Sequence, residues 1–159
     1  MNSKKTVQAV VGLLIIIIAA FFFFRGDIFT GKDSTSKSGD LRINKNEVTA
    51  QAKFYPYQAG NTGMEVLAVK AQDGSIRTAF NTCQVCYSSG RGYYEQEGEE
   101  LVCQNCGNRF NVNDVEVVRG GCNPVPIFEE NKSEDGTDIV IAESFLEQNK
   151  DLFNNWKQQ

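Results

Sequence analysis

The sequence predicts a mainly β domain with cysteine-rich metal knuckles, preceded by one N-terminal transmembrane helix and closed by a short C-terminal helix. Between residues 41 and 141, short runs of alternating apolar and polar side chains are typical of half-buried strands. Two Cys-x-x-Cys pairs, separated by sixteen residues, each provide two thiolates that can bind one metal ion. A continuous apolar run near the N-terminus has the length of a membrane-spanning helix.

The length and charge of the chain limit its organisation and its partners. With 159 residues, the chain has room for one ordinary domain and an appendage. From Gly26 onward it carries 13 basic and 20 acidic residues. Nucleic-acid backbones bind basic surfaces, so this acidic balance argues against nucleic acid as a partner.

Residues 7–24 form the predicted membrane anchor. They contain a single polar residue, a glutamine, and eighteen helical residues are long enough to cross a bilayer. A cleaved signal peptide is the alternative, but Ala19-Ala20 is followed by four phenylalanines and Arg25, which make a poor cleavage site. No cysteine follows the run, which excludes a lipoprotein anchor. The basic residues Lys4 and Lys5 predict a cytoplasmic N-terminus, so that the rest of the chain faces outward from the cell membrane.

The sequence accordingly divides into three parts. Residues 1–25 are the membrane anchor, held in the bilayer as an uncleaved signal anchor. Residues 26–40 are rich in Gly, Ser, Thr and charge, which predicts a flexible linker. Residues 41–159 form the extracytoplasmic cysteine-rich β-domain with its C-terminal helix.

Alternation of apolar and polar residues predicts the strands of the domain, and turn residues separate them. Tyr55-Pro56-Tyr57 is expected to break one strand, and Asp73-Gly74 is a strong hairpin signal. Four glutamates between residues 95 and 100 are interpreted as a solvated hairpin tip. The expected strands or extended segments are 41–43, 48–54, 64–70, 76–80, 90–94, 100–102, 109–112, 115–118, 123–127 and 138–141.

A short helix is expected after the last strand. Ser144 fits the N-cap and Glu147 the N3 position of a capping box. An apolar helical face, predicted to dock on the sheet, comprises Leu146, Asn149, Leu152, Phe153 and Trp156. The aromatic members of this face are interpreted as packing residues rather than as a ligand platform.

The predicted site contains every cysteine of the chain: Cys83, Cys86, Cys103, Cys106 and Cys122. Because the chain has no histidine, a metal would be bound through sulfur, alone or together with a carboxylate, which favours zinc, iron or Cu(I) over magnesium and calcium. Spacing alone leaves three mechanisms open. The two pairs could close a structural zinc site, bind an iron–sulfur cluster or a single iron, or perform thiol–disulfide chemistry. Cys122 remains open as a spare ligand, a lid, a resolving thiol or a small buried residue.

A family resemblance rests on specific motifs of this region. These are F-N-T-C-Q-V-C-Y, G-Y-Y-E-Q-E-G, L-V-C-Q-N-C-G-N-R-F, G-G-C-N-P-V-P-I and the helical end K-D-L-F-N-N-W-K. Over residues 41–156 the chain resembles the C-terminal domain of the FtrD-like membrane iron–sulfur proteins. That resemblance implies an iron–sulfur centre and a place in bacterial iron uptake, beside an iron permease.

A weaker resemblance concerns the fold. The order of strand, cysteine pair, hairpin, cysteine pair and proline-rich turn is similar to Rieske [2Fe–2S] domains, and it implies an antiparallel β-sandwich. Cys83 and Cys103 match the Rieske cysteine positions, and Cys86 and Cys106 stand where Rieske domains have histidine. Cys122 falls in the proline-rich loop. All-cysteine ligation would move the reduction potential toward the plant-ferredoxin value of about −400 mV.

Together these observations predict a membrane-anchored iron–sulfur protein that carries electrons in an iron or other metal uptake system. Four cysteines are the expected metal ligands, Cys83, Cys86, Cys103 and Cys106, with Cys122 beside them. The expected partners are the bilayer, through residues 7–24, and a membrane metal permease or redox protein. A zinc-stabilised extracytoplasmic binding module associated with a metal transporter, and a thiol–disulfide redox protein, are the alternatives. No constellation of catalytic acid, base and nucleophile is visible, which favours a carrier or metal-binding protein over an enzyme.

Overall fold

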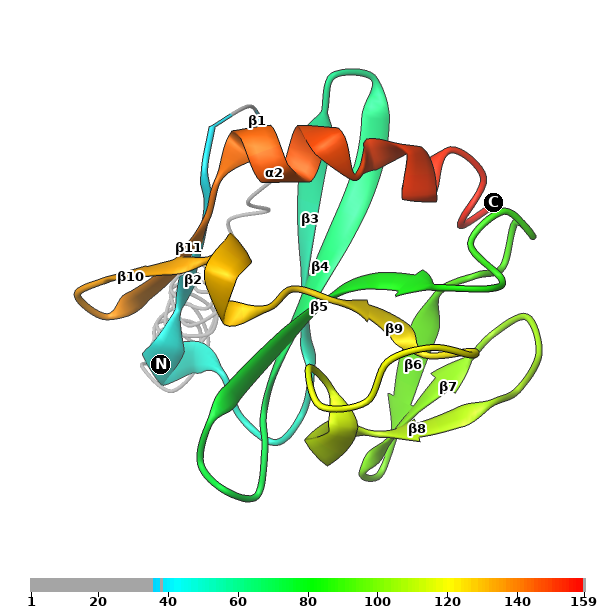
Figure 1. Ribbon diagram of the computed structural model, residues 1–159, viewed down its shortest axis with the longest axis horizontal. Coiled ribbons are helices and arrows are strands. Elements are labelled where there is room, and N and C mark those ends of the chain that lie inside the picture. The colour runs from blue at the N-terminus through cyan, green and yellow to red at the C-terminus, as the bar shows by residue number, and fades with distance from the viewer. Residues whose placement is uncertain (1–35, 38, 159) are drawn as a thin grey trace, which may run out of the picture. The chain divides into compact units, whose positions relative to one another are not determined.

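The computed structural model describes residues 36–37 and 39–158, which form three β-sheets and a short C-terminal helix (Figure 1). A five-stranded sheet has the order β1-β3-β4-β5-β9, and two three-stranded sheets have the orders β10-β11-β2 and β6-β7-β8. Every strand pair is antiparallel except β1 with β3. The predicted mainly β, antiparallel fold with a short C-terminal helix is confirmed.

The five-stranded sheet is the centre of the fold. Its strands are β1 (Ser36–Lys37), β3 (Lys53–Ala59), β4 (Thr62–Lys70), β5 (Ile76–Cys83) and β9 (Pro124–Pro126). Alternate residues of β4 point into two different cores. Val66 and Ala68 belong to the first core, and Leu67 and Val69 belong to the second. Because both faces of β4 are covered, its sequence is nearly continuous in apolar residues. The hairpin predicted at Asp73-Gly74 is present, and the Asp73 carboxylate accepts hydrogen bonds from Ser75.

Two features of this sheet differ from the expectation. Tyr55-Pro56-Tyr57 lies inside β3 and does not end it. Proline is tolerated there because β1, the neighbour on the outer side, pairs only with Tyr57 and Gln58 and needs no donor from Pro56. β1 itself falls within residues 26–40, which are predicted as linker.

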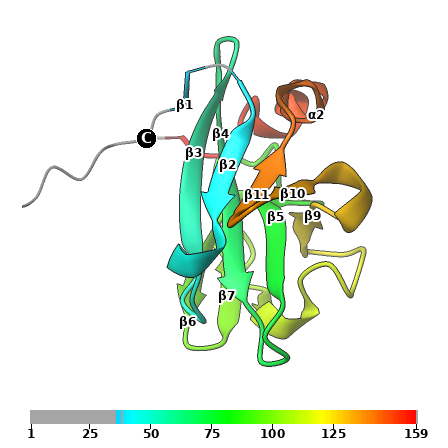
Figure 2. The same ribbon diagram turned by 90° about the vertical axis from the view of Figure 1, so that its left-hand side faces the viewer.

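One face of the central sheet is covered by the sheet of β2 (Leu41–Asn44), β10 (Ser133–Asp135) and β11 (Asp138–Ile141) and by the helix α2 (Glu143–Gln148). β10 was not expected, since its residues are polar and exposed. The first core, between these layers, includes Ile43, Phe80, Ile141 and Leu146. In both views α2 lies toward the end of the fold where β3 turns into β4 (Figures 1 and 2).

α2 begins at Glu143, two residues earlier than predicted. The expected capping box is wrong: Ala142 is the N-cap, and the distant Asp40 carboxylate accepts the hydrogen bond from the Glu143 amide at 3.0 Å. A 3-10 turn, η4 (Lys150–Phe153), follows the helix. Packing of the apolar face is confirmed, since Leu146, Phe153 and Trp156 are buried in the first core.

The second core lies on the other face of the central sheet, under β6 (Tyr94–Glu97), β7 (Glu100–Cys103) and β8 (Arg109–Asn111). The prediction of a strand over 90–94 is wrong except at its end, because Tyr94 is the first residue of β6. The predicted strand over 115–118 is also wrong. The chain there turns after the 3-10 helix η2 (Val112–Asp114), and Glu116 has a left-handed φ of 65°.

Three short 3-10 turns complete the elements: η1 (Lys45–Glu47), η2, and η3 (Glu129–Asn131). Within residues 36–37 and 39–158, no helix has the length and apolar character that crossing a membrane requires. The predicted membrane anchor, residues 1–25 with its span at 7–24, lies outside the described residues.

Candidate metal centre

The first cysteine loop begins where β5 ends. Cys83 is the last residue of the strand, and its amide donates a hydrogen bond of 2.7 Å to the Gly92 carbonyl. The Ser89 amide then donates to the Cys86 carbonyl at 3.0 Å. The loop between Cys83 and Gly92 is therefore closed on itself, with both cysteines near its base.

The second cysteine loop repeats this arrangement at the end of β7. Cys103 is the last residue of the strand, its amide donates to Asn108 at 2.9 Å, and its carbonyl accepts from the Gly107 amide at 2.8 Å. Gly107 has a left-handed φ of 72°, a conformation that favours glycine. The expected tight turn after Cys106 is thus present.

A third loop brings Cys122 to the same place. Gly120 and Gly121 have left-handed φ values of 89° and 70°, which turn the chain immediately before Cys122. The chain then enters β9, where Pro124 pairs with Cys83 of β5. In addition, the Gln84 amide donates to the Asn123 carbonyl at 3.0 Å, so the third loop is bonded directly to the first.

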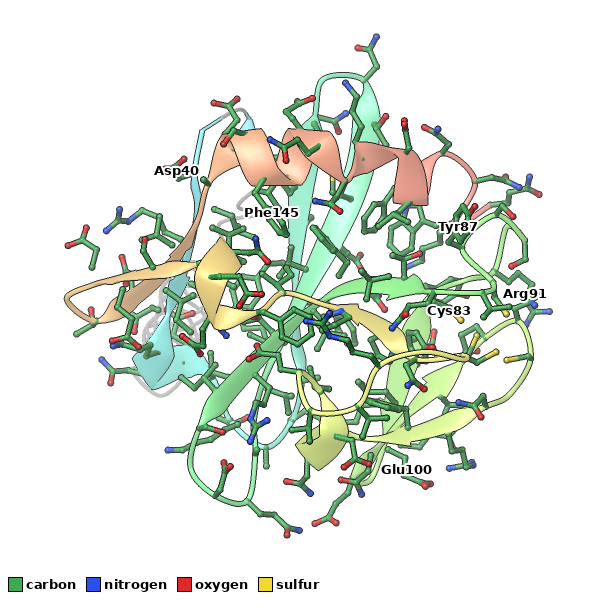
Figure 3. The ribbon with its side chains drawn as sticks, viewed as in Figure 1. Asp40, Cys83, Tyr87, Arg91, Glu100 and Phe145 are labelled. Carbon is green, nitrogen blue, oxygen red and sulfur yellow. The ribbon has the colours of Figure 1, made fainter. Side chains whose placement is uncertain are left out.

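The five sulfur atoms gather beside Cys83, on the side of the molecule opposite to Asp40 (Figure 3). They form two overlapping groups, in each of which the sulfurs lie within 4.8 Å of one another. One group is Cys83, Cys86 and Cys122, and the other is Cys86, Cys103 and Cys106. The cysteines singled out in the sequence are therefore neighbours in space, while the choice of the four metal ligands among them stays a prediction.

One side of this cysteine cluster is buried and the other is open. Cys83 is fully buried, Cys103 is 1 % exposed, and both belong to the second core. Cys106 is exposed and Cys122 is half-buried. A centre held by these residues would be screened from water on its inner side and accessible on its outer side.

The environment changes the acidity of the thiols in a graded way. Burial raises the pKa of Cys103 to about 12. The thiol of Cys122 donates a hydrogen bond to Cys106, which, together with burial, raises the pKa of Cys122 to about 12. Hydrogen bonding from the Asn108 amide lowers the pKa of the exposed Cys106. For Cys83, burial raises the pKa, but hydrogen bonds from Tyr94 and from the amides of the loop outweigh it, so the pKa is lowered.

Two functional residues were not foreseen. Tyr94 is 1 % exposed, and its hydroxyl donates a hydrogen bond of 2.7 Å to the Cys122 carbonyl. Asn108 donates to the same carbonyl at 2.9 Å from the second loop. The strand pattern could have predicted that Tyr94 lies opposite Cys103 in the hairpin. Its hydrogen bond to Cys122 could not be predicted, because that bond depends on the tertiary fold.

A buried ion pair fixes Glu116, which precedes the third loop, against β5. The Lys132 and Glu116 side chains lie 2.7 Å apart and are 4 % and 9 % exposed. The Glu116 carboxylate also accepts from the amide and hydroxyl of Thr78 in β5. These bonds explain the left-handed backbone at Glu116, which turns the chain back toward β5 where a strand was expected.

The donor chemistry of the cluster fits a sulfur-bound metal. In the part of the chain that the structure describes, the groups that could hold a metal ion consist of cysteine alone, so no carboxylate completes them. Five thiols suffice for the four thiolates that zinc, iron or an iron–sulfur cluster takes from a protein. The residues present therefore fit such a centre.

Comparison with known proteins gives one match. A family model described as "Membrane iron-sulfur containing protein FtrD-like" matches residues 33–153. Searches of curated proteins and of solved structures return no match. The matched range covers all five cysteines.

Proposed function

The chain belongs to the FtrD-like family of membrane iron–sulfur proteins, and from this premise we propose that it is a membrane-anchored electron carrier in an iron-uptake system. Its membership marks it as an iron-related, metal-binding protein of a membrane-associated family. The observation that carries the further proposal is the meeting of five thiols from three loops, buried on one side and exposed on the other.

This geometry suits electron transfer better than a purely structural role. An iron–sulfur centre bound here would accept and release single electrons. The buried residues Cys83 and Cys103 would hold the inner side of the centre in an apolar core. Little water would have to reorient there when the centre gains or loses an electron. The exposed Cys106 would bring its outer side to the surface. A structural zinc site needs no exposed edge.

The surface around Cys106 supports a protein partner. Residues 83–90, 103–108 and 120–127 of the three cysteine loops contain no charged residue, and the exposed Arg91 stands at the end of the first loop. They present two exposed apolar side chains, Val85 and Tyr87. The centres of protein interfaces are depleted in charge and enriched in aromatic residues, and electron-transfer contacts are small. We therefore infer docking of a redox partner or metal permease of the same membrane over these loops, with Arg91 at the edge of the contact.

We also infer a Rieske-like architecture for the cysteine-bearing part. Support comes from the order of its elements: one cysteine loop follows β5, the second follows β7, and the proline-rich third loop enters β9 beside the first. All-cysteine ligation by Cys83, Cys86, Cys103 and Cys106, with Cys122 alongside, would give a potential nearer to about −400 mV than to the Rieske range. With an anchor at residues 7–24, the domain would face the outer side of the cell membrane.

The test is the content of iron, zinc and acid-labile sulfide in the full chain, purified in detergent without oxygen. Iron with an equal amount of sulfide, together with a reversible reduction, is the expected result. Iron without sulfide would indicate that the carrier binds a single iron ion and not an iron–sulfur cluster.

Two results would refute the proposal. Zinc alone, after attempted reconstitution with iron and sulfide, would indicate a zinc-stabilised binding module. A metal-free protein with two disulfides would indicate thiol–disulfide chemistry.

A further inference from the structure

The first cysteine loop is held at its outer half by the segment 155–158, which we call the clasp. The Asn155 side-chain amide donates a hydrogen bond of 2.7 Å to the Ser88 carbonyl. The amide of the buried Gly90 donates to the Asn155 carbonyl at 2.7 Å. The Gly90 carbonyl accepts a third bond from the Gln158 amide at 2.8 Å. The clasp therefore binds the loop through both its backbone and a side chain.

The outer half of the loop, residues 87–91, has no other attachment among the residues that the structure describes. Outside their own loop, these residues hydrogen-bond only to the clasp. Within the loop, the Ser89 amide donates to the Cys86 carbonyl at 3.0 Å, and the Ser89 hydroxyl accepts from the Arg91 amide at 3.1 Å. The base of the loop is fixed differently, because Cys83 is the last residue of β5. The position of the outer half therefore depends on the clasp.

The clasp is anchored in the first core by Trp156, which is 8 % exposed. Its indole nitrogen donates a hydrogen bond of 3.1 Å to the Gly63 carbonyl of β4. Its ring packs edge-on against Phe153, with 5.1 Å between the ring centroids. Contact with the loop is close, since a Cβ at Gly90 would lie 3.0 Å from the Gln158 side chain. The clasp thus connects the first cysteine loop to a core other than the one that contains the buried cysteines.

Cys86 is the cysteine whose position depends on this attachment. Its sulfur belongs to both groups of the cysteine cluster, whereas each other sulfur belongs to one. Cys83 and Cys103 end strands, but Cys86 lies in the loop between its base and its outer half. The Cys86 carbonyl is bonded to the Ser89 amide, and the clasp holds the residues on either side of Ser89. A shift of the outer half would therefore move the sulfur that connects the two groups.

We propose that the clasp positions Cys86 in the cysteine cluster and thereby slows the loss of the bound metal. The inference rests on the proposed function, because it takes the cluster to hold a metal. Metal ligands keep their geometry only when surrounding contacts fix them. The sheet supplies those contacts to the strand-end cysteines, and the clasp supplies them to Cys86. Asn155 is thus a positioning residue, which acts on the cluster through the loop.

The test compares Asn155→Ala with Asn154→Ala in the full chain loaded with iron and sulfide. Asn154 is a matched control, because it is also exposed and its side-chain amide bonds to Asp151 in its own turn, at 3.3 Å. A second pair is Gln158→Pro and Gln158→Ala. Both remove the same side chain, but only proline removes the amide that donates to Gly90. The substituted residues are exposed, so the fold should tolerate each change.

The measurements are the rate of iron loss to an excess of chelator and the deuterium uptake of two peptides. One peptide covers residues 86–91, and the other, residues 103–108, is the internal reference. We expect Asn155→Ala and Gln158→Pro to lose iron about three- to tenfold faster than their controls, as removal of one hydrogen bond predicts. Deuterium uptake should rise in residues 86–91 alone. A general loss of stability would raise uptake in both peptides, so this readout separates positioning from a merely structural role.

Three results would count against the reasoning in different ways. Iron loss and deuterium uptake that match the controls in both Asn155→Ala and Gln158→Pro would overturn the proposal and leave the proposed function intact. An equal rise of uptake in both peptides would also overturn it. A wild-type chain that binds no iron would refute the proposed function and the slowing of metal loss with it, while deuterium uptake would still decide whether the clasp holds the loop. If Asn155→Ala does not fold, the pair of Gln158 variants decides alone.

Discussion

Gly92 gives the sharpest prediction about the first cysteine loop. Its backbone φ is not positive, so a left-handed conformation does not explain the glycine. The reason is close approach: a Cβ at Gly92 would lie 2.3 Å from the Cys86 carbonyl oxygen and 2.8 Å from the Tyr87 Cα. Both neighbours are backbone atoms, which cannot swing away as a side chain can.

The size of the effect follows from these distances. Ordinary contact begins at 3.4 Å, so the backbone at Cys86 would have to move by roughly 1 Å in Gly92→Ala. Binding geometry is held only when ligands stay within about 0.5 Å of their positions. We therefore expect Gly92→Ala to lose most of its bound metal and about 1–3 kcal/mol of the free energy of unfolding, the usual range for overpacking.

The assay is metal content together with urea unfolding monitored by tryptophan fluorescence. Gly63→Ala is the matched control, since Gly63 also lacks a positive φ and a Cβ there would find its nearest atom at 3.9 Å. The control should keep its metal and its stability. A Gly92→Ala protein with full metal content and wild-type stability would refute the close-approach argument.

Three further predictions concern ligands, acidity and the buried ion pair. Cys103→Ser should lose the centre and much of the folded population, because metal binding and folding are coupled; metal analysis and circular dichroism measure both. The raised pKa values of Cys103 and Cys122 mean that the metal-free fold binds more protons than the unfolded chain between about pH 9 and 12. Its stability, measured by denaturant unfolding, should fall as pH rises through that window, while metal affinity, measured by competition with a chelator, should rise with pH because ligands must lose protons. Lys132→Met should cost about 3 kcal/mol in urea unfolding, because Glu116 is left as an uncompensated buried charge.

For each of these three predictions, one experimental outcome would contradict the reasoning. A folded Cys103→Ser protein with its metal would exclude Cys103 from the ligand set. Stability of the metal-free chain that is constant from pH 8 to 12 would contradict the raised thiol pKa values. Wild-type stability in Lys132→Met would mean that water reaches Glu116, and Lys150→Met, which removes an exposed ion pair, provides the comparison.

Local patterns were sufficient for much of the fold. The nearly continuous apolar run of β4 and the Asp73-Gly74 turn specify the long hairpin, since strand preference and turn chemistry act over a few residues. The expected helix was present for the same reason, although its cap was not the expected one. Its N-terminal amide bonds to Asp40, which is far away in sequence and cannot be found from local capping rules.

The errors share a cause. Residues 115–118 have the apolar pattern of a strand, but the buried bonds of Glu116 with Thr78 and Lys132 turn the chain instead. Tyr55-Pro56-Tyr57 resembles a strand end, but the partial pairing of β3 on that side tolerates proline. In both cases a contact distant in the sequence outweighed the local preference.

By itself, the sequence determined the ligand chemistry of this protein. Five cysteines, no histidine and a Cys-x-x-Cys spacing predict that sulfur supplies the ligands of a bound metal, because two thiolates three residues apart can bind one metal ion. That no carboxylate joins them in the described residues came from the structure. The sequence predicted Cys122 beside the other four through a resemblance, and the tertiary structure supplied the physical reason, since the β5–β9 pairing brings Pro124 beside Cys83. The tertiary structure alone also placed the Tyr94 hydroxyl 2.7 Å from the Cys122 carbonyl, because such contacts depend on sheet register and packing rather than on local sequence.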